Sequence, residues 1–339
     1  MKKIITFPLS DKIEYCSVRI NNNNLATNIG GRAEDSIEEG FLENLIESLN
    51  DEVNYIIDFG DCEGAINTTP NILENLAKKN IMILAEEKLK NAFSKSKSFN
   101  GKTNKESEKV FSIIFDTQGE LYIYFEKIRG KINDNISFYF HRLVLTRFFY
   151  YDIENNSKYS FEKGNLKYLE SSNVYVNKYI NVKSLFLDAN YMILVVKDMK
   201  ELLKKHFKGE LNSIVLLGVS NNGIILANLL AYELNIPVQS LNRLGPVYCL
   251  DKKKDKYSQF GNKKYVMVSD VVCMGGEYKM AQGIVDTLGA TLLGGVCVVK
   301  IRDIYRDKCK NRVFALLDHI NEILVDGQSI DYQIYVDDN

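Results

Sequence analysis

Asp270 is the acidic residue best placed for chemistry in this 339-residue chain, because an apolar run precedes it and Gly275 and Gly276 follow it. The run at 264–268 predicts a buried strand, and residues 279–288 predict a helix with one apolar face. Where a strand, an acidic residue, a glycine turn and a helix follow one another, backbone N–H groups and the positive end of the helix dipole point into the turn. The unit therefore predicts a phosphate site beside Asp270, and a carboxylate that only caps the next turn is the structural alternative.

A second unit of the same kind lies earlier in the chain. Residues 213–219 predict a buried strand, 220–223 a turn and 224–234 a helix, while 291–299 predict a third strand. Apolar strands separated by helices indicate an α/β fold with a parallel sheet covered on both faces. Ligands of such sheets bind beyond the carboxyl ends of the strands, where both turns lie.

Five segments in this order resemble the type I phosphoribosyltransferases, and orotate phosphoribosyltransferase most, over roughly residues 170–310. The segments are 174–182 as the opening strand of the hood, 218–223 as the pyrophosphate loop, 243–264 as the mobile loop, 266–277 as the phosphoribosyl pyrophosphate signature, and 289–299 as the next strand. The resemblance implies displacement of pyrophosphate from ribose C1′ by a nitrogen nucleophile. Such an enzyme positions its reactants and stabilises the positive charge that builds on the ribose.

The resemblance also implies site residues. Asp270 would hold the ribose hydroxyls as the catalytic residue. The phosphate site would comprise Cys273, Met274, Gly275, Gly276 and Glu277, and the pyrophosphate site Ser220, Asn221, Asn222 and Gly223. The mobile-loop lysines Lys252, Lys253, Lys254 and Lys256 would reach pyrophosphate on closure, although a solvated charge run is the alternative. Mg²⁺ would be held through the substrate near Asp270 and Ser269, with no metal site built from protein ligands alone.

Four residues depart from the family's usual signature. Ser269 stands where an acid is usual, Cys273 and Met274 stand where small hydroxyl residues are usual, and Glu277 stands where the turn usually closes with Thr or Ser. A carboxylate repels phosphate, although an acid in the first turn of a helix can also be a simple helix cap. We therefore keep three hypotheses: a phosphoribosyltransferase, a catalytically silent nucleotide or sugar-phosphate sensor, and an interaction scaffold.

Composition limits the classes of protein and of site that remain. Apolar residues make up 45% and charged residues 26% of the chain, as in globular proteins, and the net charge of −1 predicts no bulk attraction to nucleic acid or membrane. The scattered cysteines predict reduced thiols in the cytoplasm. We read Cys273 as structural rather than nucleophilic, because a nucleophilic cysteine normally needs a base and none is visible nearby in the sequence. The three histidines, His141, His206 and His319, lie in no metal spacing. Family resemblance implies a homodimer.

Residues 1–155 predict a separate N-terminal α/β domain, and residues 165–339 the phosphoribosyltransferase-like domain. The first domain alternates strands (13–20, 53–59, 81–84) with helices (37–49, 70–77). Its order is weakly similar to the anti-sigma-factor antagonist domain, which implies a protein partner bound through residues 1–155. An unrelated small α/β domain is the alternative, and Asp58 at the end of a strand is read as structural.

Overall fold

The computed structural model describes residues 2–20, 37–59, 66–67, 69–79, 81–86, 103–105, 110–114, 136–161, 165–169, 174–241, 261–301, 312–318 and 327–335. The chain divides into two compact units, Met1–Arg147 with Leu324–Gln328, and Phe148–Ile323 with Ser329–Asn339. The division falls inside helix α5 (Ile136–Glu154). The predicted domain limits, 1–155 and 165–339, stay predictions. In the described part of the chain, no helix has the length and apolar character needed to cross a membrane.

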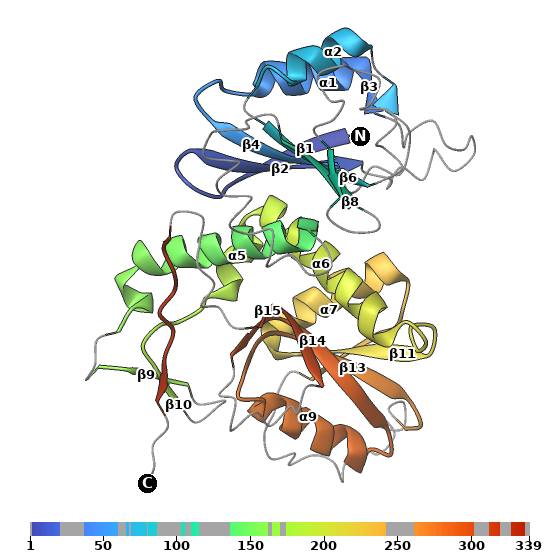
Figure 1. Cartoon of the computed structure of the whole chain (residues 1–339). Coiled ribbons are helices and arrows are strands. Elements are labelled where there is room, and N and C mark those ends of the chain that lie inside the picture. Colours follow the sequence, from blue (N-terminus) through green and yellow to red (C-terminus); the bar gives the residue numbers. More distant parts are fainter. Residues whose placement is uncertain are drawn as a thin grey trace. The chain divides into compact units, whose positions relative to one another are not determined.

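Unit 1 is built on a six-stranded mixed sheet with the order β1-β2-β4-β6-β8-β7 (Figure 1). Its strands are β1 (Lys2–Pro8), β2 (Ile13–Ile20), β4 (Asn54–Asp58), β6 (Ile81–Glu86), β7 (Thr103–Lys105) and β8 (Val110–Ile114), with β3 (Ile37–Glu38) and β5 (Ile66–Asn67) forming a separate parallel pair. Strands β2, β4 and β6 are parallel neighbours, and the outer pairs are antiparallel. The predicted alternation of strands and helices is therefore confirmed.

Helices α1 (Glu39–Ser48) and α2 (Pro70–Leu76) cover one face of this sheet. Alternate residues of β2 and β4 point to them, because side chains alternate between the two faces of a strand. Cys16, Val18 and Ile57 on the strands pack with Leu42 and Leu73 on the helices.

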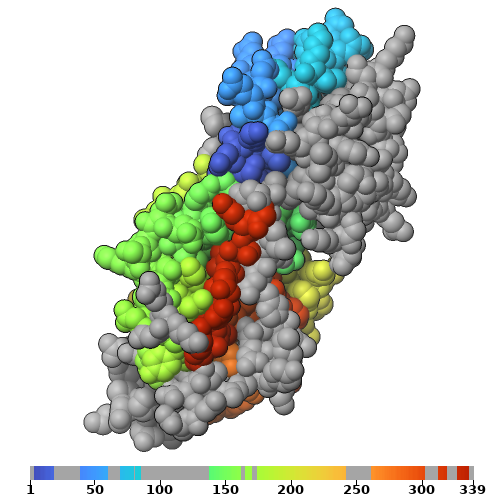
Figure 2. All heavy atoms as spheres, turned by 60° about the vertical axis from the view of Figure 1, so that its left-hand side comes forward, coloured from blue at the N-terminus to red at the C-terminus, as the bar shows by residue number. Residues whose placement is uncertain are grey.

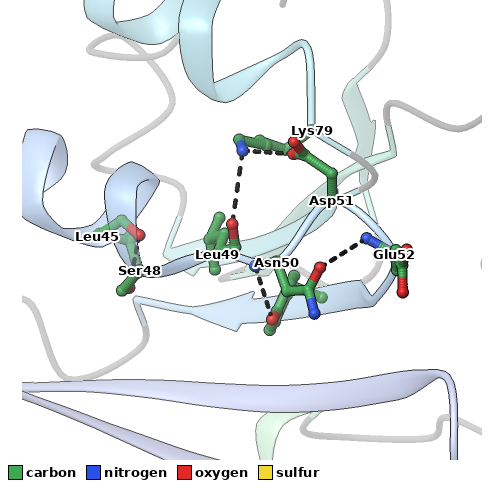
Figure 3. A network of polar contacts seen from close by, with 8 residues as sticks. Leu45, Ser48, Leu49, Asn50, Asp51, Glu52 and Lys79 are labelled. Atoms are coloured by element: carbon green, nitrogen blue, oxygen red, sulfur yellow. Dashed lines mark hydrogen bonds and ion pairs between the residues drawn. The ribbon is translucent and has the colours of Figure 1, made fainter.

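The connection from α1 to β4 is held by local polar contacts (Figure 3). Asn50 accepts from the N–H of Glu52 at 3.0 Å, as in an Asx turn, and its own N–H donates to the hydroxyl of Tyr55 at 3.1 Å. Lys79, which follows α2, pairs with Asp51 and donates to the Leu49 carbonyl. The end of α1 is thereby tied to the end of α2.

A buried polar cluster lies on the opposite face of β2. The Tyr15 hydroxyl contacts both Asp58 and, at 2.8 Å, Nε2 of His141 on α5, and the Tyr15 ring stacks on Phe140. All four side chains are buried. This cluster anchors the first half of α5 to the sheet.

Unit 2 is an α/β unit around a five-stranded sheet in the order β12-β11-β13-β14-β15, with every neighbouring pair parallel. The strands are β11 (Ile214–Val219), β12 (Val238–Leu241), β13 (Lys264–Cys273), β14 (Thr291–Ile301) and β15 (Val313–Asp318). Helices α6 (Ala189–Phe207) and α7 (Ser220–Leu234) lie on one face, and α9 (Gly276–Thr287) lies on the other (Figure 1). The expected fold class, a parallel sheet flanked by helices, is confirmed.

A small antiparallel sheet accompanies this core, with the order β16-β10-β9. It comprises β9 (Lys167–Leu169), β10 (Val174–Val176) and β16 (Ile334–Tyr335), and the short 3-10 helices η4 (Ser157–Tyr159) and η5 (Val182–Leu187) flank it in the chain. Figure 2 shows the last described residues as a red band at the molecular surface.

Three local expectations were wrong. Helix α7 begins at Ser220, so residues 220–223 form its first turn rather than a separate loop. Strand β13 continues to Cys273, so Asp270 does not end it. The hood strand stops at Val176, because the chain turns to η5 instead of continuing to residue 182.

Candidate functional site

The central sheet of unit 2 has a topological switch point between β11 and β13. From β11 the chain passes through α7 to β12 on one side, whereas β13, β14 and β15 extend the sheet on the other side. Helices that leave two neighbouring strands toward opposite faces open a crevice at the carboxyl ends of those strands, and ligands bind there in open α/β sheets.

Asp270 lies in this crevice because its two neighbouring strands differ in length. Strand β11 pairs with β13 only as far as Val268, while β14 continues to pair with β13 as far as Cys273. Asp270 therefore stands beyond the last β11 partner, on the open edge of a strand that is still held in place by β14.

Two side chains at the start of α7 bind the Asp270 carboxylate. The Asn222 side-chain amide donates to Oδ2 at 2.7 Å, and the Ser220 hydroxyl donates to Oδ1 at 3.2 Å. Ser220 Oγ also accepts from the N–H of Gly223 at 3.3 Å, as the side chain of an N-cap residue does. The neighbouring hydroxyl of Ser269, fully buried, lies 3.5 Å from Oδ1 and 3.3 Å from the Val271 carbonyl. The carboxylate is thus oriented before any ligand arrives.

Two glycines allow α7 to come this close to the sheet. A Cβ on Gly223 would lie 2.6 Å from the Val268 carbonyl oxygen, and a Cβ on Gly218 would lie 2.7 Å from the Ile224 Cα. Backbone atoms cannot move aside cheaply at such distances. Gly223 therefore serves close packing against β13, which brings Ser220 and Asn222 to Asp270.

The backbone is strained on both sides of Asp270. Among the described residues, four that are not glycine have positive φ: Ser220 (67°), Asn235 (54°), Asn262 (58°) and Met274 (56°). Asparagine tolerates the left-handed region, whereas serine and methionine do so at a cost. The two unusual cases are therefore Ser220, which donates to Asp270 from the start of α7, and Met274, in the turn after β13. Such strain clusters at functional sites.

The turn after β13 presents the start of α9. Met274 and Gly275 both have positive φ, as in a type I′ turn, and Gly275 is the residue before the helix. The N–H of Met274 donates to the Ile301 carbonyl at 2.9 Å, which fixes the turn on β14. The first N–H groups of a helix have no partner within it, so those from Gly276 onward are the donors that α9 can offer to an anion.

Glu277 sits in the first turn of α9, partly buried and close to Asp270. Burial, and then the negative charge of Asp270, raises the pKa of Glu277 to about 7. A carboxyl group with this pKa changes its charge near neutral pH. The turn after β13 therefore contains a group whose charge depends on pH near neutrality.

Electrostatic interactions link two tyrosines from the small sheet region to Asp270 and Cys273. Burial, then Asp270 and Tyr159, raises the pKa of the Tyr179 phenol, and burial, then Cys273 and Tyr179, raises the pKa of Tyr332. Both phenols therefore keep their protons at neutral pH. Neither tyrosine stands in a sequence motif, and Tyr332 belongs to the last described segment of the chain.

Asn177 ties that end of the chain to β10. Its side-chain amide donates to the Asp331 carbonyl at 2.9 Å, and its Oδ1 accepts from the N–H of Gln333 at 2.7 Å. Its backbone N–H donates to the Gln333 carbonyl at 3.3 Å, directly before the β10–β16 pairing of Val176 with Ile334. These contacts hold both neighbours of Tyr332.

The other predicted site residues fall into three groups. Cys273 and Met274 are buried in the turn, while Asn221 is exposed in the first turn of α7. The four lysines of the predicted mobile loop lie outside the described residues: Lys252, Lys253, Lys254 and Lys256. Within the residues that the structure describes, no group of three or more His, Cys, Asp or Glu side chains could hold a metal ion.

Solved structures similar to this chain include adenine and orotate phosphoribosyltransferases. Adenine phosphoribosyltransferase from Saccharomyces cerevisiae is 19% identical over 41% of this chain and 86% of its own, with a TM-score of 0.33. Orotate phosphoribosyltransferase from Aeropyrum pernix is 16% identical over 44% of this chain and 78% of its own, with a TM-score of 0.32. Adenine phosphoribosyltransferase from Trypanosoma brucei, solved with AMP, pyrophosphate and ribose-5-phosphate, is 17% identical over 42% of this chain and 69% of its own, with a TM-score of 0.29.

No protein-family model matches the chain, and no curated protein matches it. The fold of unit 2 follows from its own strand order, a five-stranded parallel sheet flanked by helices.

Proposed function

We propose that unit 2 binds a ribose phosphate in the crevice between β11 and β13, and transfers a phosphoribosyl group to or from a nitrogen heterocycle. The observation that carries the proposal is the Asp270 carboxylate, held by Ser220 and Asn222 between two turns with left-handed backbone. An oriented carboxylate between two helix N-termini suits a ligand with hydroxyls in the middle and anionic groups at both ends.

Each group has a physical task in this proposal. Asp270 accepts hydrogen bonds from the two ribose hydroxyls, and its negative charge stabilises the positive charge that builds on the ribose during transfer. The first N–H groups of α9 hold the 5′-phosphate, and the start of α7 faces the pyrophosphate. Because the α7 contacts fix Asp270 in advance, little reorganisation accompanies the reaction.

Magnesium suits the oxygen ligands of this site. Mg²⁺ prefers carboxylate and water oxygens and usually binds through one or two carboxylates plus substrate phosphates. Asp270 would hold it, with the Ser269 hydroxyl beside it, and the ion would supply charge neutralisation for the pyrophosphate.

A silent sensor is the second candidate, and Glu277 and Met274 favour it. Met274 offers no hydroxyl to a phosphate, and Glu277 repels one when it is charged. Such a turn suits a site that binds a nucleotide or sugar phosphate weakly and reports its level without turnover.

A pyrophosphate-release assay separates the two candidates. Purified protein would be incubated with phosphoribosyl pyrophosphate, Mg²⁺ and each of a panel of nucleobases, beside an Asp270→Asn variant. Release that depends on one base and falls at least a hundredfold in the variant would support the transferase, and binding without release would support the sensor. Equal release by both proteins would reject Asp270 as the catalytic residue.

Two further proposals concern partners. Residues 1–155 would bind a protein partner, and the chain would form a homodimer through unit 2. In support of the homodimer, α7 carries Ile225, Leu229 and Tyr232 on one helical face, with exposed fractions of 44%, 37% and 78%. Tyr232→Glu should then convert the dimer to a monomer, as measured by light scattering. A monomeric wild-type protein would contradict the proposed homodimer.

A further inference from the structure

Ser220 lies at a sharp turn between a strand and a helix. Strand β11 ends at Val219 and α7 begins at Ser220, whose φ of 67° falls in the left-handed region. Serine adopts this region at a cost, whereas glycine adopts it freely. Nucleophilic serines of hydrolases are held on a strained strand-to-helix turn of this kind, because the turn exposes the hydroxyl at the end of the sheet.

Glycines on both sides of Ser220 let the strand and the helix pack closely around this turn. Gly218 stands two residues before Ser220 and Gly223 three residues after it. A Cβ on Gly218 would lie 2.7 Å from the Ile224 Cα, and a Cβ on Gly223 would lie 2.6 Å from the Val268 carbonyl oxygen. The pattern Gly-x-Ser-x-x-Gly is therefore one residue longer than the Gly-x-Ser-x-Gly turn of serine hydrolases.

The Ser220 hydroxyl is also paired with a base. It donates to Oδ1 of Asp270 at 3.2 Å, and the Asn222 side-chain amide donates to Oδ2 of the same carboxylate at 2.7 Å. A nucleophile in hydrogen-bond reach of a base that a third group orients is the arrangement that activates a hydroxyl in enzymes. Ser220 and Asp270 are both partly exposed, so a substrate can reach them.

The base of this arrangement is a carboxylate, because the two described histidines have other roles. His141 bonds to Tyr15 within unit 1, and His206 stacks on Phe314 with ring centroids 3.5 Å apart. A carboxylate is a weaker base than imidazole. We therefore expect slow chemistry that favours esters with a good leaving group.

The start of α7 offers donors to a developing oxyanion. In serine hydrolases the backbone N–H of the residue after the nucleophile points at this oxygen. Here that residue is Asn221, exposed in the first turn of α7, where backbone N–H groups have no partner within the helix. The positive end of the helix dipole favours the same negative charge.

We propose that Ser220 is a nucleophile with Asp270 as its general base, and that unit 2 hydrolyses a carboxylic ester through an acyl-serine intermediate. Ser220 Oγ bonds to the ester carbonyl carbon while Asp270 takes the hydroxyl proton. The bond from that carbon to the alcohol oxygen then breaks, and the leaving alcohol takes the proton from Asp270. Water next adds to the acyl carbon and gives its proton to Asp270, and Ser220 leaves with that proton as the carboxylic acid departs.

This activity goes beyond the proposed phosphoribosyl transfer. It uses Asp270 and the start of α7, as that function does, but it requires neither a phosphate nor a metal ion. An esterase assay and a ribose phosphate titration therefore give separate answers, and the failure of one proposal leaves the other to its own test.

Covalent labelling with a fluorophosphonate, followed by peptide mass spectrometry, tests the nucleophile. The wild type should carry the phosphonyl group on Ser220. Ser220→Gly removes the hydroxyl and suits the left-handed backbone, so this variant should fold and remain unlabelled. Ser213→Ala is the matched control, because the Ser213 hydroxyl also donates to a carboxylate, Oε2 of Glu210 at 3.1 Å, from a residue outside the left-handed region. Labelling of Ser213→Ala at Ser220 should equal that of the wild type. Folded wild-type protein without a label on Ser220 would overturn the proposal.

Hydrolysis of 4-nitrophenyl acetate tests the base. Nitrophenolate release should be about a hundredfold slower in Asp270→Asn than in the wild type, since general-base catalysis contributes that much. Ser213→Ala should keep the wild-type rate, and Ser220→Gly should show only the rate of the buffer. A wild-type rate in Asp270→Asn would overturn the role of Asp270 as base. Equal rates in the wild type and Ser220→Gly would overturn the esterase activity.

Discussion

The side-chain amide of Asn222 donates to Oδ2 of Asp270 at 2.7 Å, although the two residues lie 48 positions apart in the chain. The bond joins the first turn of α7 to the open edge of β13, across the switch point of the sheet. It orients the carboxylate on which the proposed ligand site depends. The site should therefore be sensitive to the residue at position 222 even if this side chain never touches the ligand.

Asn222→Ala should weaken ribose 5-phosphate binding about tenfold, because the carboxylate loses an orienting bond that is worth about 1.5 kcal/mol. Asn228→Ala is the matched control, since its amide donates to the Ile224 carbonyl on the same helix and faces solvent. Calorimetric titration of both variants measures the effect. Equal affinities in the two variants would contradict the orienting role of Asn222.

Glu277 should make ligand binding depend on pH. Its pKa is raised to about 7, so below that pH the neutral group does not repel a phosphate, and above it the carboxylate does. Affinity for ribose 5-phosphate should fall as the pH rises from 6 to 8. The ligand's own phosphate also titrates, near about 6. Glu277→Gln, with the same shape and no charge, supplies the reference curve, and an identical pH dependence in both proteins would contradict this role.

Glu277 should also make the free energy of unfolding depend on pH, in a direction that follows from its raised pKa. The folded protein holds a proton on Glu277 up to pH of about 7. The unfolded chain releases that proton near about 4.3. Stability contributed by this group therefore falls as the pH rises between these values. The melting temperature of Glu277→Gln relative to wild type should increase from pH 5 to pH 8, and a constant difference would count against a raised pKa.

Gly223→Ala should destabilise unit 2 by about 1–3 kcal/mol, because the new methyl group meets the Val268 carbonyl oxygen at 2.6 Å. Gly283→Ala is the control, since that exposed position within α9 has no atom within 4 Å of the added Cβ. A helix-interior alanine there should stabilise by about 0.5–1 kcal/mol. Urea unfolding measures the free energy of unfolding of both variants. Similar changes of the same sign in Gly223→Ala and Gly283→Ala would contradict the close approach of α7 to β13.

Local patterns were enough to predict the parallel core of unit 2. The apolar runs that became β11, β13 and β14 are long, and the first two are each followed by polar or glycine residues and a helix. The run before Asp270 was recognised, but its end was misplaced. Strand β13 continues to Cys273 because β14 still pairs with it there, and such pairing is invisible in a single segment.

The attachment of the last described segment to β10 could not be predicted for the same reason. Strand β16 has only two residues, and its partner Tyr175 lies 160 positions before Tyr335 (335 − 175). In the sequence Asn177 is an ordinary polar residue. Its hydrogen bonds to Asp331 and Gln333 form only because the end of the chain packs against β10 in the fold. Sequence patterns locate elements that bury their own apolar residues, whereas the hydrogen bonds of Asn177 join segments that are distant in the chain.

The most direct test of the proposed site is calorimetric titration of phosphoribosyl pyrophosphate with Mg²⁺ into wild-type protein and Asp270→Ala. Asn228→Ala serves as the control for an unrelated change in unit 2. The proposal predicts saturable binding by the wild type and by Asn228→Ala, and a loss of at least tenfold in affinity for Asp270→Ala. Equal binding by all three proteins, or no binding by folded wild-type protein at millimolar ligand, would contradict a ribose phosphate site at Asp270.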